Sequence, residues 1–325
     1  MDFRTFNFGF CVCVFAHLAC VSGTFAQSDV TDSAETVGET ERPAWQWLAQ
    51  GQRRVSSRVG LYSHELDSWL AGEAYIDRAN QSVLKLRMSA EYNSRSGNQT
   101  DIEIGGSIDL PLASERWKLV LHSRTDEFRS LEEDILDSDT AQDPSVALRY
   151  EQFRLRNFKL DHDVGLRGKL PLTPYYSLRL RYGREIYEGL SISLEERLWY
   201  FARNEGQGND TIVALGKRFG DIDYLSWSNH SKYRELRDSS EFASRLTWTR
   251  IFAPYETLSL ETGAVRNGIL GSYSEQFYLK ALSRYPLIDN WLIVETSPQV
   301  QWKEELDWDQ EFQFTLAIEF LFFAF

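Results

Sequence analysis

Residues 311–320 read EFQFTLAIEF, and every second side chain in this stretch is apolar. The apolar positions are Phe312, Phe314, Leu316, Ile318 and Phe320. The residues between them are mostly polar, as at Gln313, Thr315 and Glu319. Since successive side chains of a strand point to opposite faces, this order predicts a β-strand with one apolar and one mostly polar face.

The same alternation recurs from residue 82 onward. It is clear in SVLKLRMSAEY (82–92), TDIEIGGSIDL (100–110), NFKLDHDVGLRGKL (157–170), YSLRLRYG (176–183), LSISLEERLWY (190–200) and TLSLETGA (257–264). Many of these segments have the length of about 9–12 residues that a tilted membrane-crossing strand needs. The chain has too few other apolar elements to cover so many one-sided strands. A closed barrel with lipid outside needs no such cover, so the pattern predicts a transmembrane antiparallel up-and-down β-barrel over residues 82–325.

The connections between the segments divide into two groups. We expect about fourteen strands, beginning near residues 82, 100, 117, 145, 158, 176, 190, 211, 222, 241, 257, 274, 291 and 311; loss of two pairings would reduce the count to twelve. Short turns at 111–116, 252–256 and 285–290 then fall on one side, and longer loops at 126–144, 202–210 and 303–310 on the other. Short periplasmic turns and long outer loops are typical of outer-membrane barrels. Pro298 lacks a ladder donor, so we expect a bulge there.

The N-terminal residues predict three further segments. Arg4, an apolar stretch over 9–21 and small residues at Thr24 and Ala26 indicate a signal peptide over residues 1–26. Residues 27–43 are acidic and aperiodic, which predicts a flexible leader. Residues 44–81 contain a periplasmic amphipathic helical segment. Its apolar residues recur at three- and four-residue steps over 44–72, with a break expected near Gly51 or Gly60. The helix could cap the barrel, plug it, or bind a periplasmic partner.

Composition narrows the classes of function. The formal net charge of -13 argues against nucleic-acid binding, which needs clustered basic residues. All three cysteines, Cys11, Cys13 and Cys20, lie in the predicted signal peptide, which removes thiolate chemistry from the mature chain. No phosphate-binding glycine loop is present, and no cofactor is expected. His162 lies between two aspartates, but in a strand it points away from both, so no metal site is predicted.

Charged residues on the predicted inner face are the candidate functional residues. They are Arg149, Glu151, Lys159, Asp161, Asp163, Arg167, Lys169, Arg179 and Arg181. Rings of basic side chains in a pore favour anions. The same residues could form a ladder of salt bridges that only fills the lumen, and the sequence favours this ladder over anion selection.

One pair of residues raises the question of catalysis. Ser228 and His230 lie two apart in SWSNHSKYRE and therefore share a face of a strand. A serine nucleophile needs a base within hydrogen-bond reach, so a lipid-modifying barrel enzyme is a third hypothesis. Outer-membrane lipid hydrolases carry His before Ser, whereas the order is reversed here. We therefore expect no catalytic residues and no enzyme.

Two stretches carry resemblances. The C-terminal EFLFFAF (319–325) resembles the terminal signal of bacterial outer-membrane barrels, with Leu321, Phe323 and Phe325 at alternating positions. That resemblance implies recognition by the barrel-assembly machinery and surroundings of outer-membrane lipid and lipopolysaccharide. WLAGEAYIDRANQSVLKLR (69–87) and NWLIVETSPQVQW (290–302) resemble segments of uncharacterised Gram-negative outer-membrane proteins with an N-terminal helix and a barrel. This family brings no known activity or catalytic residues.

The sequence thus favours a passive channel or binding barrel for small polar solutes, with anionic solutes as one option, in a bacterial outer membrane. The alternative is a barrel without transport that serves surface structure, adhesion or scaffolding of a periplasmic partner through residues 44–72.

Overall fold

The computed structural model describes residues 44–71, 82–110, 116–122, 144–168, 172–202, 206–235, 239–269 and 272–324. The predicted signal peptide and leader, Lys169 and Phe325 lie outside these ranges. The described chain begins with helix α2 (Ala44–Ala71). The strands are β1 (Val83–Asn93), β2 (Gly97–Asp109), β3 (Trp117–His122), β4 (Ser145–Leu155), β5 (Phe158–Arg167), β6 (Thr173–Tyr187), β7 (Leu190–Phe201), β8 (Gln207–Phe219), β9 (Asp223–Arg234), β10 (Ser239–Ala253), β11 (Glu256–Ile269), β12 (Ser272–Ile288), β13 (Leu292–Lys303) and β14 (Gln310–Phe323). A 3-10 turn, η2 (Glu304–Leu306), precedes β14.

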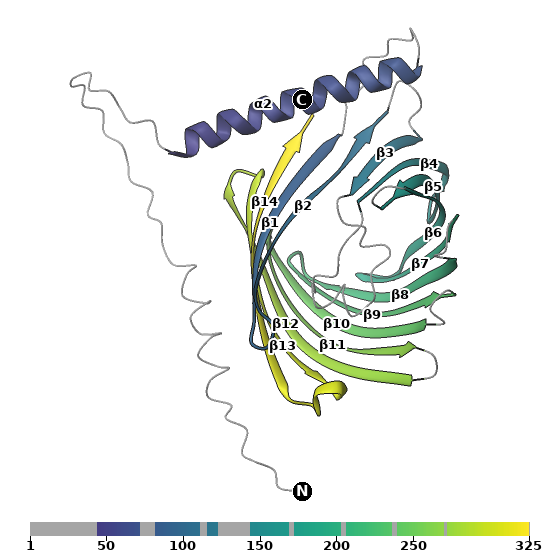
Figure 1. Cartoon of the computed structure of the whole chain (residues 1–325), viewed down its shortest axis with the longest axis vertical. Helices are drawn as coiled ribbons and strands as arrows, with labels where there is room; N and C mark the ends of the chain where they lie inside the picture. The colour runs from purple at the N-terminus through teal and green to yellow at the C-terminus, as the bar shows by residue number, and fades with distance from the viewer. Residues whose placement is uncertain are drawn as a thin grey trace, which may run out of the picture. The chain divides into compact units, whose positions relative to one another are not determined.

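The strands form one closed antiparallel barrel. Each strand pairs with its neighbours in sequence, and β1 pairs with β14 to close the wall (Figure 1). The predicted up-and-down barrel of fourteen strands is therefore confirmed for the described residues. Strands β3, β4, β5 and β7 begin at the expected residues, and the other strands begin within a few residues of the expected positions.

The ladder register sorts the side chains into two faces. Asp163 lies opposite Arg149 on one face, and Val164 lies opposite Leu148 on the other. The first face holds buried polar groups such as Asp161 and Lys232, each 1% exposed, whereas Val164 is 61% exposed. The less accessible face of a closed barrel is its interior. The polar face therefore lines the lumen and the apolar face points outward, as the alternation predicts.

Large aromatic rings lie against glycines of the inner wall. Tyr278 on β12 faces Gly263 on β11, where an added Cβ would lie 2.8 Å from the Tyr278 hydroxyl oxygen. The same hydroxyl donates to Glu261 Oε1 at 2.7 Å. A glycine at this position lets the ring pack flat on the ladder, which is a known way to stabilise glycines in sheets.

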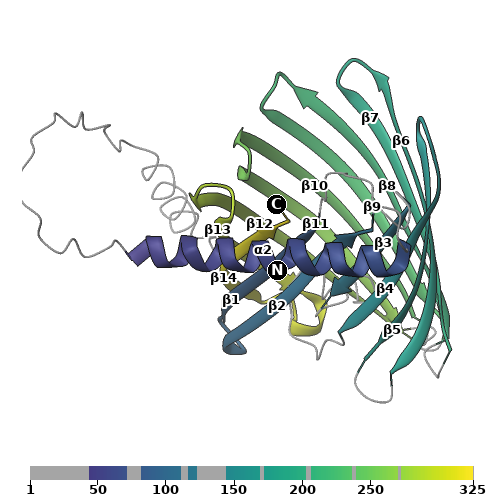
Figure 2. The ribbon, with the colours of Figure 1, turned by 90° about the horizontal axis from the view of Figure 1, so that it is seen from above.

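Helix α2 is continuous over Ala44–Ala71, so the expected break near Gly51 or Gly60 is wrong. The part of α2 from Leu48 to Gln52 packs on the ends of β13 and β14 (Figure 2). Leu48 and Ala49 contact an apolar cluster that includes Ile293 and Leu321. Gln52 Nε2 donates to the Leu321 carbonyl oxygen at 3.3 Å. Within the described residues, no helix combines the length and apolar character needed to cross a bilayer.

Pro298 on β13 does not form the bulge that the sequence predicts. It causes no register shift, so the predicted bulge is wrong. The ladder between β12 and β13 instead omits pairs at Ser297 and Pro298 and resumes in the same register, which accommodates the missing N–H donor.

On β14, Leu321 and Phe323 lie on the inward side and pack in the cluster beneath α2. The outward row ends at Phe320 and Phe322, and the assembly signal stays a prediction.

Candidate functional site

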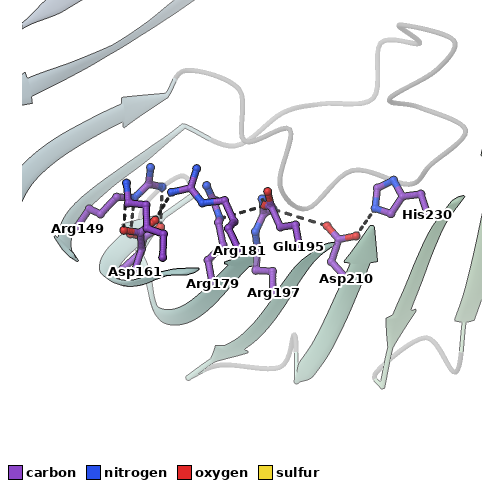
Figure 3. A network of polar contacts seen from close by, with 10 residues as sticks. Arg149, Asp161, Arg179, Arg181, Glu195, Arg197, Asp210 and His230 are labelled. Carbon is purple, nitrogen blue, oxygen red and sulfur yellow. Dashed lines mark hydrogen bonds and ion pairs between the residues drawn. The ribbon is translucent and has the colours of Figure 1, made fainter. Parts of the chain in front are cut away.

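The predicted lumen residues lie together on three neighbouring strands. Arg149 and Glu151 are on β4, the acids and bases from Lys159 to Arg167 are on β5, and Arg179 and Arg181 are on β6. The register places all of these described side chains on the inward face. A network of ion pairs follows the wall from strand to strand (Figure 3). It includes Arg149, Glu151, Lys159, Asp161, Asp163, Arg179 and Arg181.

The network begins with two buried aspartates on β5. Arg149 binds Asp163 with two hydrogen bonds, from Nε to Oδ1 at 2.7 Å and from Nη2 to Oδ2 at 2.8 Å. Asp161 accepts a hydrogen bond from Arg181 and lies 3.4 Å from Lys159 Nζ. Lys159 also pairs with Glu151 at 2.8 Å. Both aspartates are thus paired with cations, which offsets the cost of burying their charge.

The network then continues along β6, β7, β8 and β9. Glu195 pairs with Arg179 at 3.4 Å and with Arg197 at 3.3 Å. Arg197 also lies 3.7 Å from Asp210, and Asp210 is hydrogen-bonded to His230. These β7–β9 residues were not among the predicted lumen residues. The alternation of LSISLEERLWY indicates that Glu195 and Arg197 share a face, but it does not show which residues of the next strand they meet.

A second network spans the closure seam between β1 and β14. Glu295 on β13 accepts from Arg87 at 2.7 Å and pairs with Arg284 at 3.3 Å. Glu319 on β14 pairs with the same Arg284 at 2.9 Å and with Lys85 at 3.4 Å. These four strands, β1, β12, β13 and β14, are therefore cross-linked by shared carboxylates.

The two parts of the lumen wall differ in charge. On the described inward face of β4–β10, the basic residues are Arg149, Arg154, Lys159, Arg167, Arg179, Arg181, Arg197, Arg218, Lys232, Arg234 and Arg245. The acidic residues of that face are Glu151, Asp161, Asp163, Glu185, Glu195, Asp210 and Glu241. Bases outnumber acids here, whereas acids outnumber bases on the described inward face of the other strands. A concentration of one sign in a confined channel raises the local concentration of the opposite ion.

Some basic groups of this wall have hydrogen-bonding capacity left over. Arg234 pairs with Glu241 at 3.5 Å, but its buried Nε and Nη2 atoms have no hydrogen-bond acceptor among the described residues. The buried Nε atom of Arg181 also has no hydrogen-bond acceptor among the described residues. Buried donors of this kind normally bind an acceptor, so solvent or a bound anion can accept their hydrogen bonds.

Ser228 and His230 both point into the lumen. His230 is buried and is hydrogen-bonded to Asp210, and Ser228 lies opposite Arg245 in the β9–β10 ladder. Acyl chains would lie on the other side of the wall from both residues, which does not favour a role in lipid hydrolysis. His162 points outward, away from Asp161 and Asp163, as strand alternation predicts.

The fold and the charged interior define the class of protein as a closed β-barrel with a polar lumen. No family model matches the chain, and no curated protein matches it. Among solved structures it is similar to a loop-deletion mutant of OmpT, an outer membrane protein of Vibrio cholerae, with a TM-score of 0.46, 10% identity and coverage of 75% of this chain and 99% of that one. It is also similar to OprD of Pseudomonas aeruginosa, with a TM-score of 0.42, 9% identity and coverage of 79% and 98%. The KdgM porin gives a TM-score of 0.35 and 8% identity, with coverage of 73% and 98%.

Proposed function

We propose that this protein is an outer-membrane barrel that passes or binds small anionic solutes. The observation that carries the proposal is the excess of basic over acidic side chains on the inward face of β4–β10. This excess occurs in a chain whose formal net charge is -13, so the basic residues are concentrated in the lumen against the overall composition. The outward apolar face supports membrane insertion, since a closed barrel satisfies its backbone in lipid.

The ion pairs of the network do not cancel this excess. Arg149 and Asp163 neutralise one another, but Arg218 and Arg245 belong to the same wall and no acid faces them directly in the ladders. Arg234 meets Glu241 only at 3.5 Å. Paired residues therefore shape the wall, and the surplus bases give it a positive potential.

Conductance of the full mature chain in a planar lipid bilayer tests this proposal. A KCl gradient across the bilayer should give a reversal potential with the sign of anion selectivity. Arg245→Gln should reduce that selectivity because it removes an inward charge. Arg266→Gln removes an outward charge and is the matched control, so it should leave selectivity unchanged. Equal selectivity for both ions, or a preference for cations, would contradict the proposal.

A second candidate is a barrel without transport, and the extensive pairing of Asp161, Asp163 and Glu195 favours it. Such a ladder stabilises the wall and narrows the lumen. A folded barrel that shows no single-channel events, with or without residues 47–71, would support this candidate over the first.

A further inference from the structure

Helix α2 has three faces, and the barrel buries one of them. Gln52 and Ser56 lie on the barrel side and are buried, and Gln52 Nε2 donates to the Leu321 carbonyl oxygen at 3.3 Å. The helix lies across the end of β14 and therefore follows the rim of the barrel (Figure 1). Its two flanks are left to meet the surroundings of this rim.

The two exposed flanks of α2 differ in character. One is mostly apolar, and we call it the tyrosine flank; it consists of Gly51, Val55, Arg58 and Tyr62. The other is polar throughout, and we call it the polar flank; it consists of Gln50, Arg53 and Ser57. The residues of each flank recur at three- and four-residue steps, so they share a face of the helix. Tyr62 is 64% exposed, so the barrel leaves the tyrosine flank uncovered.

The rim that α2 follows is continuous with the outward apolar wall. Leu292 and Phe320 face one another on the outward side of the β13–β14 ladder. Leu292 is 4% exposed, whereas Leu279 and Leu316 of the same outward wall are 41% and 42% exposed. Leu292 belongs to the buried cluster on which Leu48 of α2 packs, and Phe320 packs on that cluster too. The helix therefore lies where the outward apolar wall reaches the rim.

The charge of α2 differs in sign from that of the chain. Its side chains are described from Gln46 to Tyr62, and they include Arg53, Arg54 and Arg58 but no acid. The chain as a whole has a formal net charge of -13. Guanidinium groups form paired hydrogen bonds with phosphate oxygens. Basic residues beside an apolar face are typical of helices that lie in the headgroup layer of a membrane.

We infer that the tyrosine flank of α2 binds the phospholipid headgroup layer at the rim where β14 ends, which is the periplasmic rim in the predicted topology. Val55 and Tyr62 lie among the headgroups beside the outward wall, where an amphipathic tyrosine ring is favoured. Arg58 pairs with lipid phosphate, and the polar flank faces water. The helix is then held from two sides, by the apolar cluster and by lipid, and lies at the rim of the lumen. This inference needs membrane insertion but not anion passage.

Fluorescence quenching tests this contact with the full mature chain in vesicles of phosphatidylcholine and phosphatidylglycerol. The predicted mature chain has no cysteine, so a fluorophore can be attached at one chosen position. Gly51→Cys places it on the tyrosine flank, where an added Cβ meets nothing within 4 Å. Gln50→Cys places it on the polar flank. Phospholipid that carries a nitroxide on its headgroup should quench the first label, and aqueous iodide should quench the second.

A label on Met88→Cys, on the outward wall, reports insertion of the barrel in the same vesicles. Phospholipid with a nitroxide on its acyl chain should quench this label whether or not α2 contacts lipid. Insertion of the barrel and lipid contact of the helix are therefore measured separately.

The arginines of the two flanks provide a matched pair of variants. Arg58→Gln should lower the equilibrium constant of the lipid contact about fivefold, which is the usual effect of one basic residue at an anionic membrane surface. Headgroup quenching of the Gly51→Cys label should fall accordingly. Arg53→Gln removes the same charge from the polar flank and should leave this quenching close to its original value. Circular dichroism should show the same spectrum for both variants.

Three results would overturn the inference. Equal access of iodide to the two helix labels, with the Met88→Cys label in lipid, would show that α2 stays in water beside an inserted barrel. Protection of the Gly51→Cys label only after addition of purified peptidoglycan would identify the cell wall as the occupant. Equal losses for Arg58→Gln and Arg53→Gln would show that Arg58 does not bind phosphate. The reversal potential is measured independently, so each of these results would leave the proposed anion selectivity standing.

Discussion

Arg149 and Asp163 face one another directly across the β4–β5 ladder and share two parallel hydrogen bonds, at 2.7 and 2.8 Å. The Asp163 side chain is 2% exposed, and this guanidinium compensates its buried charge. Paired charges of this kind fix the register of two strands while they line the lumen. Inward bases outnumber inward acids on β4–β10, so bases remain in excess after such pairs have formed. The same wall is therefore both rigid and positively charged.

Removal of Arg149 should destabilise the barrel. Arg149→Met leaves Asp163 buried without its partner, which should lower the free energy of unfolding by about 2 kcal/mol. Urea unfolding of the reconstituted barrel, followed by tryptophan fluorescence, measures this change. The double variant Arg149→Met, Asp163→Leu should recover most of the loss, because neither charge is then left unpaired. A single variant as stable as the parent chain would show that the pair is not important for stability.

Gly263 should not tolerate a side chain. Gly263→Ala places a Cβ 2.6 Å from the Ser244 carbonyl oxygen and 2.8 Å from the Tyr278 hydroxyl oxygen. The ladder must therefore shift, and the Tyr278 ring must move and lose its bond to Glu261. We expect a loss of about 1–3 kcal/mol in unfolding free energy, the usual cost of overpacking. Gly183→Ala is the matched control, since nothing lies within 4 Å of its added Cβ. Equal stability of the two variants would contradict the packing described for Tyr278.

The docking of α2 can be measured by proteolysis. Leu48→Asp places a charge in the cluster with Ile293 and Leu321, so the helix should detach and trypsin should cleave after Arg53 and Arg54 faster. A loss of about 1.4 kcal/mol in docking raises the detached population about tenfold, and cleavage should follow that population. Trp47→Asp lies on the exposed side of the helix and should leave the cleavage rate unchanged. Equal cleavage of both variants would mean that α2 is not held by this cluster.

The barrel could be predicted because each strand shows the alternation of apolar and polar residues in its own sequence. In 82–92 and 311–320 the alternation identified the strand and both of its faces, since period two is a local property. The charged residues of β4–β6 were assigned to the lumen for the same reason. Glu195, Arg197 and Asp210 were missed as part of the site because their meeting depends on cross-strand register, which a single sequence does not specify. The prediction of a bulge at Pro298 was wrong because the β12–β13 ladder omits the pairs at Ser297 and Pro298, which accommodates the missing N–H donor without a register shift.

The position of the two faces relative to lipid and water is the central claim, and two adjacent residues of β1 test it most directly. Met88 points outward and is 37% exposed, whereas Ser89 points into the lumen opposite Asp101. A nitroxide attached to Met88→Cys in lipid bilayers should be relaxed by oxygen, which concentrates in hydrocarbon, and the same label on Ser89→Cys should be relaxed more by a water-soluble nickel complex. Equal access of the nickel complex to both sites would show that the apolar face is not in lipid, and the account would fail.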